Sequence, residues 1–223
     1  MKTLLPLYVH PLVDPAAWDA VARPGLDVLV VVNVHNGPDD GTDPVYREAT
    51  ARLHAAGVPM LGYLDVDYGR RPEPLVREDI ARWDGYPVGG VFVDRVPSGR
   101  ADLAGIARLV RPASGTVALN PGTRTDPGYH DLADIVCTFE GPWSAYHADP
   151  EPEPAYPNPE PAYANRETEP EPDSACHLVY GVPVDRLGAA TAVVAGRVRY
   201  GLVTELTAPL PYLGLPGRLA VAR

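Results

Sequence analysis

Long apolar runs and cysteine are scarce in this 223-residue chain, and each scarcity excludes a class of protein. No apolar stretch reaches the roughly 18 residues that a transmembrane helix needs, so we expect no membrane span. The two cysteines, Cys137 and Cys176, lie 39 positions apart without Cys-x-x-Cys or histidine-rich spacing, which speaks against a zinc site. We interpret them as two buried thiols, and a disulfide between them is the alternative.

We also expect neither a leader sequence nor a stretch that binds nucleic acid. The chain starts with one lysine and an apolar run that Pro6 interrupts, and no small-residue cleavage site follows. We therefore expect no signal peptide, which indicates a cytoplasmic protein as the sequence stands and a secreted one if the start is truncated. No lysine and arginine run interleaved with aromatics occurs, so nucleic acid is not an expected partner.

The formal net charge of −10 comes mostly from one segment. Residues 149–173, DPEPEPAYPNPEPAYANRETEPEPD, hold eight acids, one arginine and eight prolines, so they contribute −7 and leave −3 for the remainder. Such a composition cannot supply regular backbone hydrogen bonds and predicts an extended acidic, Pro-rich loop. The loop is either a tolerated surface insertion or a lid or electrostatic fence beside a site.

The rest of the chain alternates between short apolar runs and segments of helical composition. We expect strands over 4–9, 27–33, 60–66, 89–93, 116–120, 135–140, 177–182 and 200–205. We expect helices or short helical pieces over 15–22, 44–56, 75–83, 101–110, 129–133, 143–147 and 184–196. Strands buried on both faces read as continuous apolar runs, which is typical of a parallel sheet.

Eight such repeats favour a closed (β/α)8 TIM-like barrel over an open doubly wound sheet, because no Gly-x-Gly-x-x-Gly follows a strand. The same absence leaves no reason to expect a nucleotide cofactor. We predict one domain over residues 1–223, with the acidic loop between the sixth and seventh strands. Without that loop about 200 residues remain, the lower limit for this fold, so some helices must be short or missing. An incomplete barrel is the alternative.

Polar residues follow nearly every predicted strand. Catalytic groups of such barrels gather at the carboxyl ends of the strands, so these residues are site candidates. They are His10, Asn33, Asp65 with Asp67, Asp94, Asn120, Glu140 and Glu205. Nearby aromatics are Tyr8, Tyr63, Tyr68, Phe92, Phe139 and Trp143. Each polar residue taken alone could be a turn former or a cap, whereas the pair Asp94 and Glu140 ends two apolar strands.

This ring of acids, amides and aromatics suits a polyhydroxylated ligand, which offers hydroxyls to hydrogen-bond and C–H faces to stack. It also suits glycoside hydrolysis, which needs one carboxylic acid and one carboxylate. A metal site is a third interpretation of the carboxylates. No histidine cluster supports it, so we predict no bound metal.

Several motifs resemble those of the spherulation-specific family 4, or spherulin-4, proteins. They are PLYVHP at 6–11, VNVHNGP at 32–38, GYLDVDYGRRP at 62–72, DIARWDGYPVGGVFVD at 79–94, LNPGT at 119–123 and ADIVCTFEGPW at 133–143. They cover nearly the whole chain outside the acidic loop. Some members of this family are (β/α)8 glycoside hydrolases that cut α-1,4-linked galactosamine or N-acetylgalactosamine polymers of microbial exopolysaccharides. The resemblance implies that fold and that substrate class.

The family pattern has an Asp-Glu pair after the fourth strand and a Glu after the sixth. Here the resemblance implies Asp94 and Glu140 as catalytic residues, but Arg95 stands where the pattern has glutamate. A cation there would lower the pKa of Asp94, unless Arg95 lies in the loop and pairs with the acidic insertion. If the lost glutamate was the general acid, Asp94 and Glu140 must share both roles, or Asp65, Asp67 or Glu205 must substitute.

Two functions follow. The first is a glycosidase with Glu140 as general acid and Asp94 as nucleophile or electrostatic partner. Residues expected to contact the polysaccharide or oligosaccharide are Tyr8, His10, Asn33, Tyr63, Asp65, Asp67, Tyr68, Asn120, Trp143 and Glu205. A partly deacetylated galactosamine polymer is cationic, and the acids would attract it. The second is a catalytically inactive carbohydrate-binding barrel that lost the acid at position 95. The distance between the Asp94 and Glu140 carboxyls discriminates between them.

Overall fold

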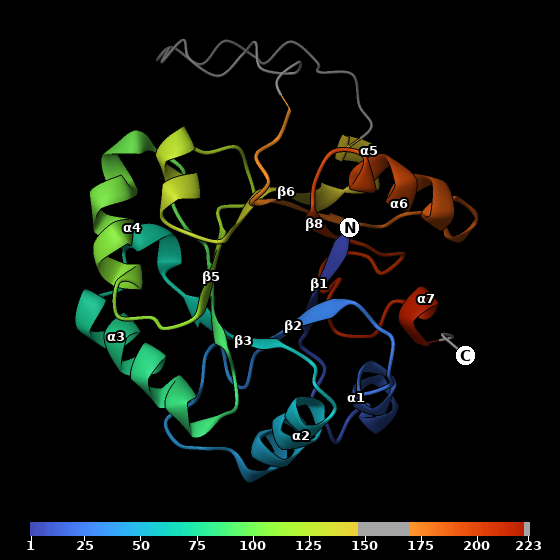
Figure 1. Cartoon of the computed structure of the whole chain (residues 1–223), viewed down its shortest axis with the longest axis horizontal. Helices are drawn as coiled ribbons and strands as arrows, with labels where there is room; N and C mark the ends of the chain where they lie inside the picture. The colour runs from blue at the N-terminus through green and yellow to red at the C-terminus, as the bar shows by residue number, and fades with distance from the viewer. Residues whose placement is uncertain (147–169, 221–223) are drawn as a thin grey trace.

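The apolar runs of the sequence form eight parallel strands that close into a barrel in chain order (Figure 1). The computed structural model describes residues 1–146 and 170–220. The strands are β1 (Lys2–Leu7), β2 (Val28–Val32), β3 (Met60–Asp65), β4 (Gly90–Asp94), β5 (Thr116–Asn120), β6 (Ile135–Pro142), β7 (Ala175–Tyr180) and β8 (Tyr200–Val203). The predicted (β/α)8 barrel is confirmed, and the alternative of an incomplete barrel is wrong, because β8 pairs with β1 at Lys2↔Tyr200 and Thr3↔Gly201.

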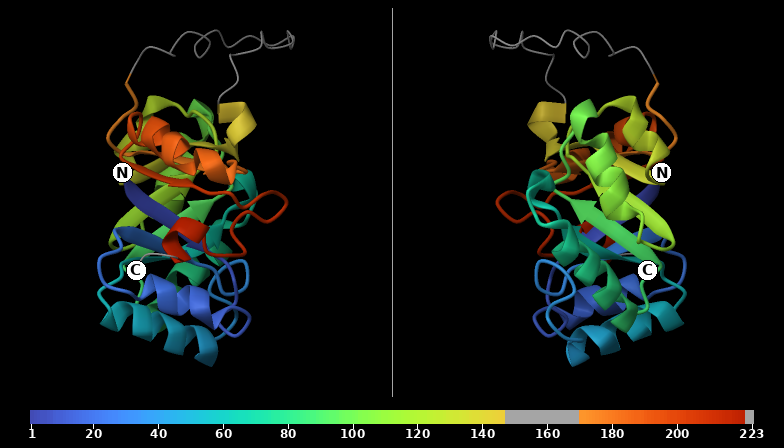
Figure 2. Two further views of the ribbon diagram at one scale, coloured as in Figure 1. Left: turned by 90° about the vertical axis from the view of Figure 1, so that its right-hand side faces the viewer. Right: turned by 90° about the vertical axis from the view of Figure 1, so that its left-hand side faces the viewer.

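Helices flank the strands on the outside, as the two side views show (Figure 2). They are α1 (Pro15–Val21), α2 (Pro44–Ala55), α3 (Glu73–Arg82), α4 (Leu103–Val110), α5 (Trp143–Tyr146), α6 (Leu187–Ala195) and α7 (Gly217–Ala220). Short 3-10 turns are η1 (Asp67–Gly69), η2 (Trp83–Gly85), η3 (Arg100–Asp102), η4 (Pro127–Asp131) and η5 (Val184–Arg186). Among the described residues, the helices next to β6 are short, because η4 alone precedes this strand and the four-residue α5 follows it. None of the helices in the described ranges has the length and apolar character needed to cross a bilayer.

Two strands lie two residues earlier than predicted. β1 stops at Leu7 because the next backbone N–H, that of Tyr8, donates to the carbonyl of Tyr212 in the segment after β8. β7 stops at Tyr180 because Gly181 adopts a φ of +67°, a left-handed conformation that ends an extended strand. Both differences arise from contacts or backbone angles that local apolar patterning does not specify.

Side chains along β3 and β4 point alternately into the barrel interior and toward the helix layer. Tyr63 and Phe92 are register partners, and their rings stack inside the barrel with centroids 6.3 Å apart. Gly62 faces outward, where the indole of Trp83 occupies the space of its missing side chain. Trp83 is 2% exposed and donates its indole N–H to the Tyr63 carbonyl at 3.0 Å. Side chains therefore fill both sides of the sheet, and the site lies at its carboxyl edge.

The predicted acidic loop, residues 149–173, lies outside the described residues except for 170–173. In that short part, Glu171 approaches the Arg124 guanidinium at 3.3 Å. The two cysteines are free thiols, buried and opposite each other on β6 and β7.

Candidate active site

The carboxyl ends of β3, β4 and β5 place three polar side chains side by side. Asp65 is the register partner of Asp94, and Asp94 is the register partner of Asn120. Parallel strands end at the same edge, so residues that are far apart in sequence meet there. Glu140 of β6 joins this row through the Asn120 side chain.

Five residues form one hydrogen-bonded chain across the barrel mouth. The Tyr63 hydroxyl donates to Asp94 Oδ2 at 2.6 Å, and Asn120 Nδ2 donates to Asp94 Oδ1 at 2.8 Å. The same Nδ2 donates to Glu140 Oε2 at 2.6 Å, and the Tyr212 hydroxyl donates to Glu140 Oε1 at 2.7 Å. Each of the four carboxyl oxygens therefore accepts a hydrogen bond, and one amide links the two acids.

The shared amide limits the distance between the two carboxyls. Asp94 Oδ1 and Glu140 Oε2 lie 2.8 Å and 2.6 Å from one nitrogen, so they are no more than about 5.4 Å apart. Retaining glycosidases hold their two carboxyls roughly 5–5.5 Å apart, whereas inverting enzymes separate them by about 6.5–9.5 Å. The upper limit of about 5.4 Å is therefore close to the retaining spacing and below the inverting one.

A bulge in β6 aims Glu140 into the mouth. Thr138 is an extra residue in the pairing of β6 with β7, and both Thr138 and Phe139 contact the outward-facing His177. Two consecutive residues on the outer face shift the alternation by one, so Glu140 points inward and reaches Asn120. Without the bulge, regular alternation would turn this carboxylate toward the helix layer.

Burial raises the pKa of both acids. Desolvation is the largest cause of the raised pKa of Asp94, and hydrogen bonds from Tyr63 and Asn120 oppose it. Desolvation likewise raises the pKa of Glu140, opposed by the hydrogen bonds from Asn120 and Tyr212. The backbone N–H of Arg95 also lowers the pKa of Asp94. The environment thus favours protonation of one of the two acids. Three groups lower the pKa of Asp94 and two lower that of Glu140, so the charged form is better stabilised at Asp94.

The expectation that Arg95 lowers the pKa of Asp94 is wrong, because the guanidinium turns away from it. Arg95 has a φ of +55°, and its Nε and Nη2 donate to the two carboxylate oxygens of Asp65 at 2.8 Å and 2.5 Å. Its Nη1 lies 3.2 Å from Asp67. The alternative expectation, that Arg95 pairs with the acidic insertion, falls on residues that lie mostly outside the described ranges. Within those ranges, the guanidinium contacts Asp65 and Asp67.

Asp65 and Asp67 are consequently neutralised and do not add free negative charge to the mouth. Asp65 also accepts from the Asn36 side chain at 3.1 Å, and the Arg95 guanidinium keeps its pKa below the usual value despite burial. Asp67 pairs with Arg70 at 2.8 Å. Tyr68 is 53% exposed, and the guanidiniums of Arg70 and Arg95 lie 5.5 Å and 5.7 Å from its ring centroid. Of the predicted acids, Asp94 and Glu140 are the ones joined at the mouth.

The loop after β1 and the loop after β2 give two predicted residues local partners instead. The Asn33 side chain accepts from the backbone N–H of Gly37 at 3.0 Å, so it closes its own turn. His10 Nδ1 accepts from the Leu12 N–H at 3.1 Å, and its ring packs edge-on against Tyr46. Both residues therefore act here as turn formers.

Trp143 and Glu205 also contact neighbouring parts of the fold instead of Asp94 or Glu140. Trp143 is 8% exposed and stacks on Tyr146 in a second apolar cluster outside the barrel. Glu205 accepts from the backbone N–H of Gly217 at 2.6 Å, which anchors the start of α7. Tyr8, by contrast, is at the mouth: its ring packs edge-on against Tyr63 at 5.5 Å.

Tyr212 is the site residue that the sequence analysis missed. It lies in a Pro- and Gly-rich segment after β8, PLPYLGLP, which gives no strand or helix signal. With Tyr8, Tyr180 and Glu140 it lines a pocket of about 280 Å³ whose remaining wall is residues 208–213. An aromatic residue between prolines is the signal that could have found it, but only barrel closure brings it to Glu140.

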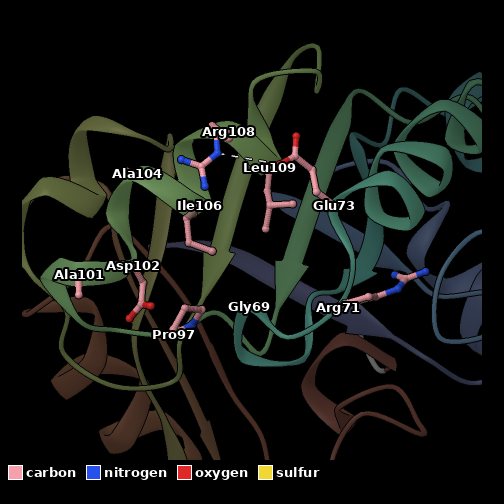
Figure 3. A pocket seen from close by; sticks show the side chains of 11 residues that line it. Gly69, Arg71, Glu73, Pro97, Ala101, Asp102, Ala104, Ile106, Arg108 and Leu109 are labelled. Carbon is pink, nitrogen blue, oxygen red and sulfur yellow. Dashed lines mark ion pairs between the residues drawn. The ribbon is translucent and has the colours of Figure 1, made fainter.

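A second hollow, of about 410 Å³, lies on the outside between α3 and α4 (Figure 3). Of its charged residues, Asp102 and Arg108 are exposed and Arg71 and Glu73 are half-buried. Arg108 approaches Glu73 at 4.0 Å. Glu73 is also paired with Arg77 at 2.6 Å. Neither Asp94 nor Glu140 lines this hollow, so it is separate from the linked carboxyls. Within the described residues, no group of three or more histidines, cysteines or acids is placed to hold a metal ion.

The fold and the mouth define a (β/α)8 barrel with a pair of hydrogen-bonded carboxyls at the carboxyl ends of its strands. Residues 2–220 match the family described as spherulation-specific family 4, and the chain belongs to that family. The resemblance seen in the sequence motifs is therefore confirmed.

Two relatives illustrate the similarity. Spherulin-4 of Physarum polycephalum is 34% identical over 151 residues, which are 63% of this chain and 45% of that protein. This chain thus matches less than half of that relative. The crystal structure of Aspergillus clavatus Sph3 in complex with GalNAc superposes with a TM-score of 0.78 at 24% identity, covering 98% of this chain and 94% of that chain. It confirms the barrel fold over nearly the full length.

Proposed function

We propose that this protein is a glycoside hydrolase that cuts α-1,4-linked galactosamine or N-acetylgalactosamine polymers. One observation carries the proposal: Asp94 and Glu140 share the amide of Asn120, which holds their nearest oxygens no more than about 5.4 Å apart. This spacing suits a retaining mechanism, in which one acid protonates the leaving oxygen while the other attacks the sugar.

The hydrogen bonds support Glu140 as the acid and Asp94 as the nucleophile. Asp94 accepts from a phenol and an amide, and the backbone N–H of Arg95 also favours its charged form. Glu140 accepts from two donors, and burial raises its pKa, which suits a carboxyl that delivers a proton.

The chemistry proceeds in two displacements. Glu140 gives its proton to the glycosidic oxygen while an Asp94 oxygen bonds to the anomeric carbon, so the carbon–oxygen bond to the leaving sugar breaks. Glu140, now a carboxylate, takes a proton from water, and that water displaces Asp94 from the sugar. The product keeps the anomeric configuration of the substrate.

The substrate class rests on the family and on the solved relative. The chain belongs to spherulation-specific family 4, and the resemblance to that family implies this substrate class because some members act on galactosamine-containing exopolysaccharides. The related Sph3 was crystallised in complex with GalNAc. Tyr8 lines the pocket beside Glu140 and offers an aromatic ring, and the amide of Asn120 offers a polar group for sugar hydroxyls.

A carbohydrate-binding barrel without turnover is the second candidate. The observation that favours it is Arg95, which stands where the family pattern has a second acid and is held by ion pairs to Asp65 and Asp67. If chemistry requires an acid at that position, the mouth binds sugar without cutting it.

The test is release of reducing ends from a partly deacetylated α-1,4-galactosaminogalactan. Wild type is compared with Asp94→Asn, Glu140→Gln and, as a control on an exposed face of α2, Glu48→Gln. We expect turnover by wild type and Glu48→Gln and a loss of at least a hundredfold in the two site variants. NMR of the first product should show the α anomer. Polymer binding without turnover in all four proteins would contradict the proposed hydrolase and support the carbohydrate-binding barrel.

A further inference from the structure

The segment after β8 returns across the mouth and supplies a side chain to Glu140. Its backbone is tied to the barrel by the Tyr8 N–H, which donates to the Tyr212 carbonyl at 3.1 Å. The two rings pack edge-on with centroids 5.9 Å apart. The Tyr212 hydroxyl is therefore fixed from two sides when it donates to Glu140 Oε1 at 2.7 Å.

The two oxygens of Glu140 have chemically different partners. Oε2 accepts from the amide nitrogen of Asn120, a group that can only donate. Oε1 accepts from the Tyr212 hydroxyl, which can donate one hydrogen bond and also accept others. When Glu140 is protonated, a proton on Oε2 would face an N–H, whereas a proton on Oε1 can be accepted by the phenol oxygen.

We propose that Tyr212 is a positioning residue for Glu140, and that Oε1, the oxygen it contacts, carries the proton that Glu140 transfers. The inference rests on the proposed function and deepens it by assigning the reacting atom. The phenol donates to the carboxylate after proton transfer and accepts from the acid before it, so one contact serves both states. Tyr212 and Glu140 line the same pocket of about 280 Å³, so their contact lies beside a space for a sugar.

The structure also indicates why the role belongs to Tyr212. Tyr63 is committed to Asp94 at 2.6 Å, and Tyr8 is the ring that supports both tyrosines. A phenylalanine at position 212 would keep the ring contact and the backbone hydrogen bond, because neither involves the hydroxyl. The variant Tyr212→Phe therefore removes one hydrogen bond with little change in packing.

The first readout does not depend on activity. Carbon-13 NMR of labelled glutamate carboxyls follows the titration of Glu140, whose signal is the one missing from Glu140→Gln. In Tyr212→Phe we expect this titration to move to higher pH, because a donor to the charged form is lost. Tyr200→Phe, at the start of β8 and the opposite end of the barrel, should leave it unchanged.

The second readout is the pH profile on the galactosaminogalactan. In Tyr212→Phe we expect kcat to fall about tenfold to a hundredfold with little change in KM, and the basic limb of kcat/KM to move to higher pH. An unchanged titration and an unchanged limb would overturn the inference. If the titration shifts in Tyr212→Phe but the wild type shows no turnover, the proposed function is contradicted and the contact of Tyr212 with Glu140 is still supported.

Discussion

Arg95 stands where the family pattern has glutamate, and the direction of its side chain determines how this difference affects the site. Its left-handed backbone turns the side chain away from Asp94 and onto Asp65, whose side chain is 7% exposed. Asp65 thereby gains a partner for a buried charge, and Asp94 keeps hydrogen bonds only from neutral donors. The substitution removes an acid from the mouth and leaves the linked pair of Asp94 and Glu140 intact.

Restoring the acid with Arg95→Glu should destabilise the fold. The change leaves the buried Asp65 carboxylate without its guanidinium and places a like charge beside it. We expect a loss of about 2–3 kcal/mol in the free energy of unfolding, measured in urea at pH 7. The double variant with Asp65→Asn should recover most of that loss. A single variant as stable as wild type would show that the ion pair contributes nothing.

Glu140→Gln should be more stable than wild type at neutral pH. Burial makes the folded pKa of Glu140 higher than the unfolded one, so its contribution to stability is full below the unfolded pKa and is lost as pH rises through the folded pKa. The glutamine side chain of this variant carries no charge and can still accept from Asn120 and pair with Tyr212.

We therefore expect Glu140→Gln to gain about 1 kcal/mol in the free energy of unfolding at pH 7. The gain should shrink as pH falls toward the usual pKa of glutamate, 4.5. Urea unfolding across this pH range measures it, with Glu48→Gln as the control that should show no such trend. A gain that grows on acidification would contradict the assigned direction.

At the scale of elements, the sequence predicted the strands and part of the site. Asp94 and Asn120 were found because each ends an apolar run, and parallel strands bring such ends together. The Thr138 bulge was not predictable, because it depends on how β6 pairs with β7 rather than on local pattern. Asn33 and His10 had the same sequence signal as Asn120, but their loops use them for turns.

The contact between Gly62 of β3 and Trp83 of η2 offers a test of how packing supports the site. A Cβ at position 62 would lie 2.3 Å from the indole of Trp83, so Gly62→Ala forces the indole outward. Trp83 bonds to the carbonyl of Tyr63, and Tyr63 holds Asp94. We expect a loss of about 2–3 kcal/mol in the free energy of unfolding and weaker turnover.

Gly188→Ala is the matched control for this change. Gly188 lies in α6 with no atom near its missing Cβ, so alanine should stabilise the helix by about 0.5–1 kcal/mol. Urea unfolding of both variants checks the comparison. Equal effects at the two positions would contradict the close approach of Trp83 to β3.

At the scale of the whole molecule, closure of the barrel creates what the linear pattern could not show. Pairing of β8 with β1 brings the segment after β8 beside Tyr8, and this places Tyr212 on Glu140. The two residues are 72 positions apart, and no local signal links them. The sequence thus predicted the acids of the site, whereas the groups that orient them depend on the tertiary fold.

A buried histidine of β7 packs against the second apolar cluster and links stability to pH. His177 is 5% exposed, shares a hydrogen bond with the Tyr146 hydroxyl at 2.8 Å and lies 3.1 Å from Thr138 Oγ1. Burial, together with the nearby positive charges of Arg197 and Arg124, lowers its pKa to about 4, while Glu171 lies 3.9 Å away.

His177→Gln should flatten the acid side of the stability profile. Because the folded pKa of about 4 lies below the ordinary 6.5, the unfolded chain binds a proton first as pH falls between these values, so wild type loses stability there. Glutamine does not titrate, and the difference between wild type and variant should change by on the order of 2 kcal/mol between pH 7 and pH 4. Urea unfolding at several pH values measures it, with His54→Gln on the exposed side of α2 as control. Parallel profiles for wild type and His177→Gln would show that His177 is protonated equally in the folded and unfolded chains.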